Sequence, residues 1–149
     1  AAVNDSSYTV AGDALTALSK IDSAAAIEQA KKLSSAPAKG ELKYALLSNS
    51  DETKFDEIYN NYAALAFGNE QFFTIKPFAH FLGNVKSTDK VKKGVDLLVK
   101  IRGDIPQQYH SFTDPEINGA LKELMQKKQG ASLMDQSDYI KSKLPADTK

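Results

Sequence analysis

The chain has 149 residues, enough for a single domain (1–149) with a core of its own. Nineteen Lys and Arg residues balance nineteen Asp and Glu residues, which argues against a nucleic-acid-binding protein or a polybasic membrane anchor. The absence of cysteine excludes disulfides, thiolate metal sites and cysteine catalysis. No apolar run reaches the length of a membrane span, and no signal-peptide pattern is present. We therefore expect a soluble domain, either cytoplasmic or exported, with no nucleic-acid or membrane partner.

The N-terminal part predicts a first helical hairpin. Apolar side chains recur every three or four residues over about 6–19 and 22–33, the period of an amphipathic helix. Asp5 or Ser6 can cap the first helix, and Asp22 can cap the second. Because only two residues separate the helices, they should lie antiparallel and adjacent.

A second hairpin is expected after Pro37, which cannot continue a helix. Its helices cover about 38–48 and 52–66, and Asp51 stands in the short turn between them with capping chemistry. Gly68 ends the second of these helices.

The third hairpin covers about 70–83 and 87–101, and Ser87, Thr88 and Asp89 can cap its second helix. Its first helix contains Pro77, which predicts either a kink or a helix that begins near Lys76. Gly103 is expected to stop the second helix.

Four phenylalanines, Phe72, Phe73, Phe78 and Phe81, make this hairpin the most aromatic part of the chain. We interpret them as core that fills the space between helix layers. A ligand pocket and an interface with another domain remain the alternatives.

The pattern then changes. Residues 103–113 predict a polar loop. Asp114 and Pro115 predict the start of a helix, with aspartate as the cap and proline at the first helical position. A short last helix follows at about 135–143, so that the terminal helices span about 114–144.

The three hairpins, together about 6–102, begin near residues 5, 38 and 70, a spacing of roughly 32 residues that is typical of helical-hairpin repeats. Such hairpins bury their inner faces by stacking on their neighbours. We therefore predict an all-α fold of about eight helices, an α-α superhelix of stacked antiparallel hairpins of the HEAT/ARM kind. An irregular helical bundle is the alternative.

No recognisable catalytic motif occurs. The only histidines are His80 and His110, and no HExxH motif, phosphate-binding glycine loop or GxSxG elbow is present. His80, among aromatic residues, is interpreted as a packed or edge histidine. Lys127 and Lys128 are interpreted as part of a solvated face. We predict no catalytic residue, no metal ligand and no cofactor in this chain.

Three residues near the predicted loop are candidates for contacts with a peptide or partner: Arg102, Tyr109 and His110. Arg102, the only arginine, could pair with a peptide carboxylate. Tyr109 and His110 lie in the long loop, where functional residues are frequent. A surface salt bridge is the opposing interpretation of Arg102, and a small enzyme with a site at these three residues is a further alternative.

The opening segment from Asp5 to Asp22, DSSYTVAGDALTALSKID, resembles the start of the C-terminal helical domain of M1-family zinc aminopeptidases, where a D-x-S-Y-x-V-x-x-x-A-L-x-x-L line begins the helical array. The segments 22–33 and 72–83 also resemble parts of that domain.

The resemblance implies a non-catalytic accessory domain. The zinc ligands of HExxH, the distant glutamate ligand and the GAMEN-type motif would lie in an upstream catalytic domain of the same polypeptide, and none has a counterpart here. The zinc would also belong to that domain. The helical array would cap the catalytic cleft, contact peptide substrate indirectly and limit its access. The first residue is Ala1 rather than methionine, which predicts a processed chain or part of a longer one. A free-standing helical-repeat scaffold that binds a protein or peptide remains the alternative.

Overall fold

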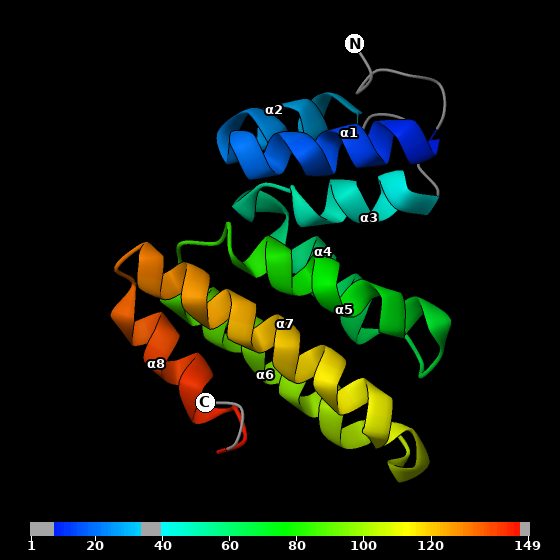
Figure 1. Cartoon of the computed structure of the whole chain (residues 1–149), viewed down its shortest axis with the longest axis vertical. Helices are drawn as coiled ribbons and strands as arrows, with labels where there is room; N and C mark the ends of the chain where they lie inside the picture. The colour runs from blue at the N-terminus through cyan, green and yellow to red at the C-terminus, as the bar shows by residue number, and fades with distance from the viewer. Residues whose placement is uncertain (1–7, 34–39, 147–149) are drawn as a thin grey trace.

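The structure is a computed structural model that describes residues 8–33 and 40–146, and these residues are helical with no strand among them. The helices are α1 (Tyr8–Ile21), α2 (Ser23–Leu33), α3 (Gly40–Ser48), α4 (Phe55–Ala63), α5 (Asn69–Leu82), α6 (Thr88–Asp104), α7 (His110–Gly130) and α8 (Met134–Ser142). The short 3₁₀ helices η2 (Glu52–Lys54) and η3 (Gln107–Tyr109) precede α4 and α7. The all-α class is confirmed (Figure 1). The predicted cap at Asp5 or Ser6 and the break at Pro37 lie outside the described residues.

The odd-numbered helices pack side by side in the order α1, α3, α5, α7, and we call this set the odd-helix layer. Three pairs of helices that follow each other in the chain pack directly against each other: α1 with α2, α5 with α6, and α7 with α8. In the middle of the chain α3 packs mainly on α1 and α5, whereas α4 packs on α6 (Figure 1). The superhelix of the HEAT/ARM kind stays a prediction.

Side-chain caps begin several helices where the sequence predicts them. Asp22 Oδ1 accepts a hydrogen bond from the backbone N–H of Ala25 at 3.0 Å. Ser87 accepts one from the backbone N–H of Lys90 at 3.4 Å, at the start of α6. Asp51 caps η2 in the same way. These bonds satisfy N–H groups that have no partner inside their own helix.

The loop predicted over 103–113 is wrong. α6 continues through Gly103 to Asp104, and α7 already begins at His110. No atom lies within 4 Å of the place that a Cβ would take at Gly103. The only local effect that opposes helix at this residue is therefore the low helix propensity of glycine. Ile105, one turn after the buried Ile101, is also buried, and this burial outweighs the glycine.

Pro115 does not begin a helix as predicted, because it lies inside α7, five residues after its first residue. Proline supplies no N–H group to the carbonyl four residues earlier, so its usual place is the first turn. The hydroxyl of the buried Thr113 donates to the carbonyl of Tyr109 at 3.0 Å within the same stretch. The prediction that a helix begins near Lys76 is also wrong, because α5 starts at Asn69 and runs through Pro77.

The core has two parts of unequal size. The larger cluster lies among α4, α5, α6, α7 and α8 and includes the fully buried Tyr62, Phe78 and Leu121. The smaller cluster joins α1, α2 and α3 through Leu15 and three alanines. Most of the buried apolar area, and hence most of the hydrophobic stabilisation, therefore lies in the C-terminal two thirds of the chain.

The turn between α5 and α6, residues 83–87, is held by polar side chains from other elements. Asn84 donates to the carbonyl of Ser48 at 3.0 Å. The Glu52 carboxylate accepts from the backbone N–H groups of Lys86 and Ser87. Gln136 of α8 donates to the carbonyl of Lys86 at 2.9 Å.

The contact that Lys128 of α7 makes with this turn is the most unusual of them. Its side chain is 1% exposed, and its ammonium group donates to the carbonyl of Val85 at 2.6 Å. The solvated position expected from sequence is therefore wrong. The pKa of Lys128 is lowered to about 8, mainly by burial and also by repulsion from Lys127, while attraction by Glu52 opposes the shift.

We expect Gly94→Ala to destabilise the fold. An added Cβ would lie 2.4 Å from a methyl carbon of Leu82, so α6 and α5 would have to separate. The overpacking should lower the free energy of unfolding by about 1–3 kcal/mol in chemical denaturation. Gly119→Ala in α7, where nothing lies within 4 Å, is the matched control and should be neutral or stabilising by up to about 1 kcal/mol. Equal effects of the two substitutions would contradict this account.

Lys128 should make stability depend on pH. Its pKa is about 8 in the native state against 10.5 for the ordinary value, so between these values the unfolded chain binds more protons. The stability of the wild type relative to Lys128→Met should therefore rise by up to about 3 kcal/mol as pH increases from about 8 to about 10.5. Urea denaturation at several pH values measures this difference, with Lys122→Met, an exposed lysine of α7, as control. A difference that does not change with pH would refute the assignment.

Candidate functional site

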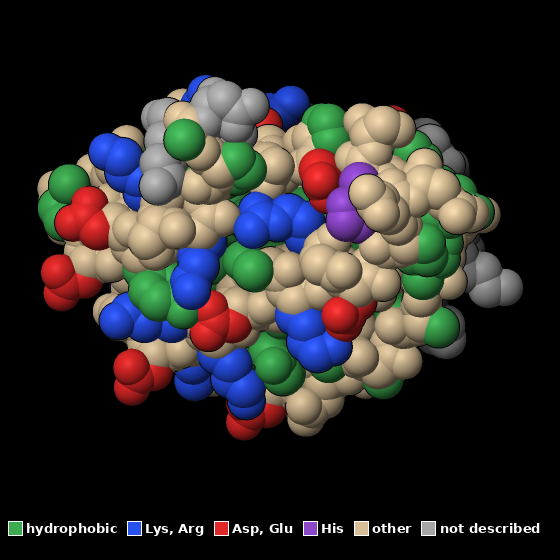
Figure 2. All heavy atoms as spheres, turned by 90° about the horizontal axis from the view of Figure 1, so that it is seen from below, with side chains coloured by type: hydrophobic (Ala, Val, Ile, Leu, Met, Phe, Trp, Pro, Cys, Tyr) green, Lys and Arg blue, Asp and Glu red, His purple; other side chains and the backbone are tan. Residues whose placement is uncertain are grey.

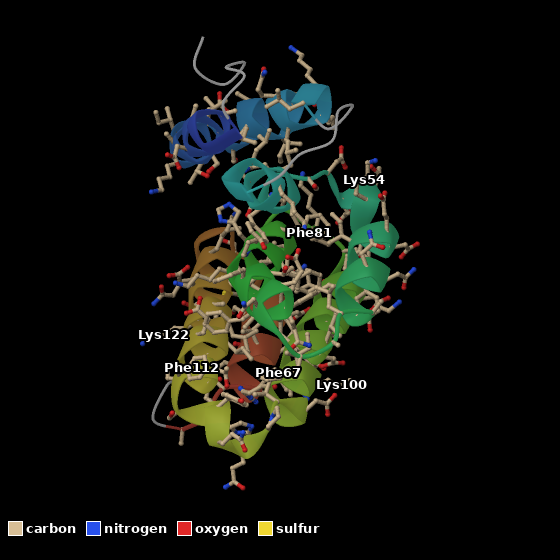
Figure 3. All side chains as sticks on the ribbon, turned by 90° about the vertical axis from the view of Figure 1, so that its right-hand side faces the viewer. Lys54, Phe67, Phe81, Lys100, Phe112 and Lys122 are labelled. Carbon is tan, nitrogen blue, oxygen red and sulfur yellow. The ribbon has the colours of Figure 1, made fainter. Side chains whose placement is uncertain are left out.

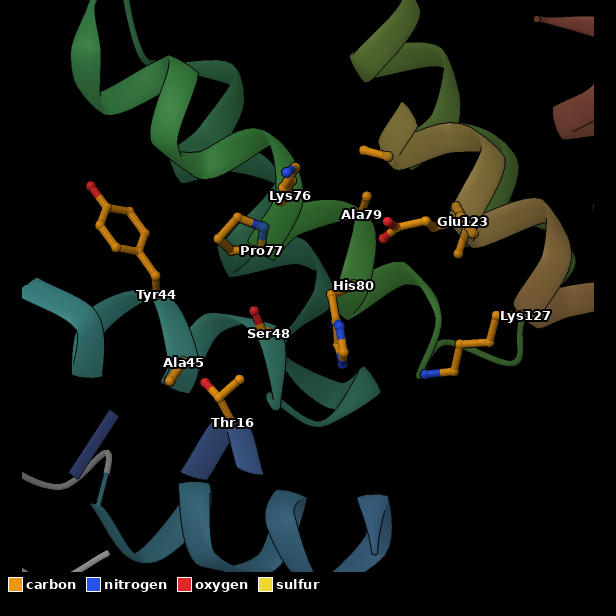
Figure 4. Close-up of a pocket in the computed structure, with 12 residues that line it drawn as sticks. Thr16, Tyr44, Ala45, Ser48, Lys76, Pro77, Ala79, His80, Glu123 and Lys127 are labelled. Atoms are coloured by element: carbon orange, nitrogen blue, oxygen red, sulfur yellow. The ribbon is translucent and has the colours of Figure 1, made fainter. Parts of the chain in front are cut away.

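A hollow of about 600 Å³ lies on the odd-helix layer, between α1, α3, α5 and α7 (Figure 4). Helix α3 contributes Tyr44 and Ser48, and α5 contributes Lys76 and His80. Small or apolar side chains, among them Ala45, Ala79 and Leu124, form other parts of its lining. The remaining ionisable groups come from α7, in the form of Glu123 and Lys127.

The two charged groups from α7 have opposite sign. Lys127 Nζ donates to the amide oxygen of Asn84 at 3.3 Å. Neither Lys127 nor Glu123 forms an ion pair with any other residue in the part of the chain that the structure describes. Partial burial lowers the pKa of Lys127, although the residue as a whole is exposed.

His80 lies in the hollow rather than in the core. Desolvation lowers the pKa of His80, repulsion from Lys127 lowers it further, and attraction by Glu123 opposes both. The imidazole is therefore neutral at neutral pH and can accept or donate a hydrogen bond. The sequence places His80 among aromatic residues but gives no sign that α7 brings two charges beside it.

The ionisable side chains of the hollow are not joined to one another. Among the described residues, no hydrogen bond links His80 to Ser48 or to Glu123, the contacts that join a nucleophile, a base and an orienting acid. No group of three or more metal-ligating side chains occurs within 8–33 and 40–146. Separate charged and apolar side chains therefore line the hollow.

A continuous row of six aromatic rings crosses the odd-helix layer beside the hollow, and we call it the aromatic row. Successive ring centroids are 4.9–6.4 Å apart, in the order Tyr44, Phe73, Phe72, Phe112, Tyr109, Phe67. Three of these side chains are exposed, Phe67 at 44%, Phe73 at 55% and Phe112 at 52%. Figure 3 shows Phe67, from the link between α4 and α5, and Phe112, from α7, at the same end of the molecule.

The interpretation of the four phenylalanines of α5 as core is therefore only partly right. Phe78 and Phe81 are fully buried, Phe72 is half-buried, and Phe73 is more than half exposed. The reason is the helical period, because Phe73 does not share the face of α5 that carries Ile75, Phe78 and Leu82. For the exposed rings the alternative stated from sequence, an interface, fits better.

The candidate contact residue Arg102 has a structural role. Its guanidinium donates to Asn118 Oδ1 at 2.6 Å and to the carbonyl of Lys143 at 3.1 Å. It thereby joins α6 to α7 and to the residue that follows α8. Two N–H groups of the guanidinium are thus engaged within the domain, and a contact with a peptide carboxylate stays a prediction.

The other two candidates lie close to the start of α7. His110 Nε2 is 2.6 Å from the carbonyl of Ile105, and its Nδ1 is 3.5 Å from the carboxylate of Asp114. Tyr109 belongs to the aromatic row. Partner contacts by all three candidates stay predictions.

Charges of both signs are interspersed on the lower face of the molecule (Figure 2). This mixture agrees with the zero net charge of the chain. No helix of the described residues combines the length and apolar character needed to cross a membrane.

Comparison with known proteins returned nothing: no family model, no curated protein and no solved structure matches the chain. The resemblance to the C-terminal domain of M1-family aminopeptidases therefore stays a prediction from the sequence.

We expect Arg102→Ala to lower the free energy of unfolding by about 1–3 kcal/mol, because two hydrogen bonds from a charged donor are lost. Lys100→Ala, which removes an exposed ion pair with Asp104 on the same helix, is the control and should lower the free energy of unfolding much less. Thermal or chemical denaturation compares the two. A loss for Arg102→Ala no greater than the control's would show that the guanidinium does not join the helices.

Proposed function

We propose that the chain is a non-catalytic accessory domain of an M1-type zinc aminopeptidase, a metalloprotease whose catalytic domain lies upstream in the same polypeptide. The odd-helix layer packs against that domain, caps its cleft and limits the access of peptides. The zinc is bound by the catalytic domain, and this chain supplies no ligand to it.

The aromatic row carries the proposal. Contiguous exposed aromatic side chains are uncommon on a free-standing domain and mark contacts with another protein surface. The row is formed by α3, α5 and α7 with η3 and the α4–α5 link, so one partner surface can cover it across the odd-helix layer.

The charges along the aromatic row support an apolar partner surface. Lys43 forms an ion pair with Glu70, whose carboxylate also accepts from the Tyr44 hydroxyl. Lys76 forms another with Glu116 at 3.5 Å. These charges are already paired within the domain. The rings between them are therefore best covered by an uncharged surface of a neighbouring domain.

The identity of the partner domain is inferred from the resemblance of the opening segment to the M1 family. In the M1 family the corresponding helical array looks toward the active site. The hollow shares Tyr44 with the aromatic row, so a domain covering the row would bring the hollow close to its own surface.

A free-standing helical-repeat scaffold that binds a protein or peptide is the second candidate, and the same exposed rings favour it. The coding sequence before Ala1 separates the two. An upstream coding region that contains HExxH would support the accessory domain, whereas a start codon just before the codon of Ala1 would support the scaffold.

The proposal predicts that the isolated chain, with added zinc, does not hydrolyse aminoacyl-arylamides but binds the separately produced upstream domain. The double substitution Phe73→Ser and Phe112→Ser should weaken this binding by at least about tenfold, because two exposed rings lose their apolar contacts. Isothermal titration calorimetry measures the affinity.

Ile21→Ser is the control, since Ile21 is 85% exposed at the α1–α2 turn, outside the aromatic row. It should leave the affinity unchanged. Turnover by the chain alone, or equal binding by the double variant and the wild type, would overturn the proposal.

A further inference from the structure

The hollow presents an unusual pair of charges. Glu123 and Lys127 are one helical turn apart on α7, a spacing at which opposite charges commonly pair. Here they do not form an ion pair with each other, nor with another described residue. Figure 4 shows both side chains extending from α7 into the hollow, toward the helix that carries His80.

Each of the two charges favours a ligand group of the opposite sign. The ammonium group of Lys127 forms no ion pair with another described residue, and its hydrogen bond to the neutral amide of Asn84 is long, at 3.3 Å. A ligand carboxylate would give it a charge-assisted contact. The carboxylate of Glu123 can accept in the same way from an ammonium group. A ligand with only one charge would leave one of the two residues without a partner.

The size and lining of the hollow limit the ligand further. A volume of about 600 Å³ accommodates a small molecule, and pockets of roughly 300–1,000 Å³ are usual for such sites. Ala79 and Leu124 offer an apolar wall for a side chain, and the Tyr44 ring lies at another side. The neutral His80 adds one donor and one acceptor near the charged pair.

We propose that the hollow binds a free amino acid or dipeptide in its zwitterionic form, with the ligand carboxylate at Lys127, its ammonium group at Glu123 and its side chain against the apolar wall. This site does not depend on the proposed accessory role, because its residues all belong to this chain.

The two histidines allow a direct test by proton NMR on the full chain. His80 lies in the hollow, whereas His110 is bonded to the carbonyl of Ile105 and serves as an internal reference. Titration with leucine or leucyl-leucine should shift the His80 imidazole signals saturably and leave those of His110 in place. N-acetyl-leucine and leucinamide, which each lack one charge, should bind at least about tenfold more weakly.

Binding should also change the pKa of His80, because the two charged groups of the ligand would offset the effects of Lys127 and Glu123 on the imidazole. The other ionisable groups that line the hollow are Lys76 on the same helix, Glu123 from α7 and Tyr44 from α3, and α1 contributes only Thr16. A ligand bound elsewhere would leave the pKa of His80 unchanged.

Substitution tests the two charged residues separately. Lys127→Gln and Glu123→Gln should each weaken leucine binding by at least about tenfold, since each removes one charge-assisted contact. Lys122→Gln, at an exposed position of α7 outside the hollow, is the matched control and should bind as the wild type does. Circular dichroism melting curves identify any variant that fails to fold.

The absence of a saturable His80 shift, or equal affinity for leucine, N-acetyl-leucine and leucinamide, would overturn the zwitterion site. Neither result would affect the accessory-domain proposal, which depends on the aromatic row and is tested by binding to the upstream domain.

Discussion

The hydrogen bond from the Lys128 ammonium group to the carbonyl of Val85 lies where the separate parts of the fold meet. It fixes the α5–α6 turn against α7, and from the same turn further bonds lead to α3, η2 and α8. Burying an amine costs free energy, and the lowered pKa of Lys128 reflects that cost. The large apolar cluster around the turn offsets it. The positions of α3, η2, α7 and α8 relative to the α5–α6 turn therefore depend on this one group of hydrogen bonds.

The position of these hydrogen bonds determines which side chains the odd-helix layer exposes. The fixed turn orients α5 and α7, and these two helices form the walls of the hollow together with α3. The aromatic row runs from the same α3 residue, Tyr44, along the other side of α5 to the start of α7. The hollow, which charged and apolar side chains line together, and the aromatic row therefore lie next to each other on one layer.

The N-terminal helices are attached differently. Leu15, Ala26, Ala30 and Ala45 join α1, α2 and α3, so short side chains allow close approach but bury little area. Helices α1 and α2 together contribute only Thr16 to the hollow. Helix α1 thus lies at one end of the odd-helix layer, and the hollow and the aromatic row are built mainly by α3, α5 and α7.

The sequence alone determined the all-helical class, the pairing of α1 with α2, and the caps at Asp22 and Ser87, because helical periodicity and capping act over a few residues. It could not determine the course of the chain near Gly103, since the burial of Ile105 depends on distant helices. Nor could it show that Lys128 is buried or that Glu123 and Lys127 face a hollow. A lysine on a helix has the same local pattern in water and in the core, and only the packing of other helices decides between them.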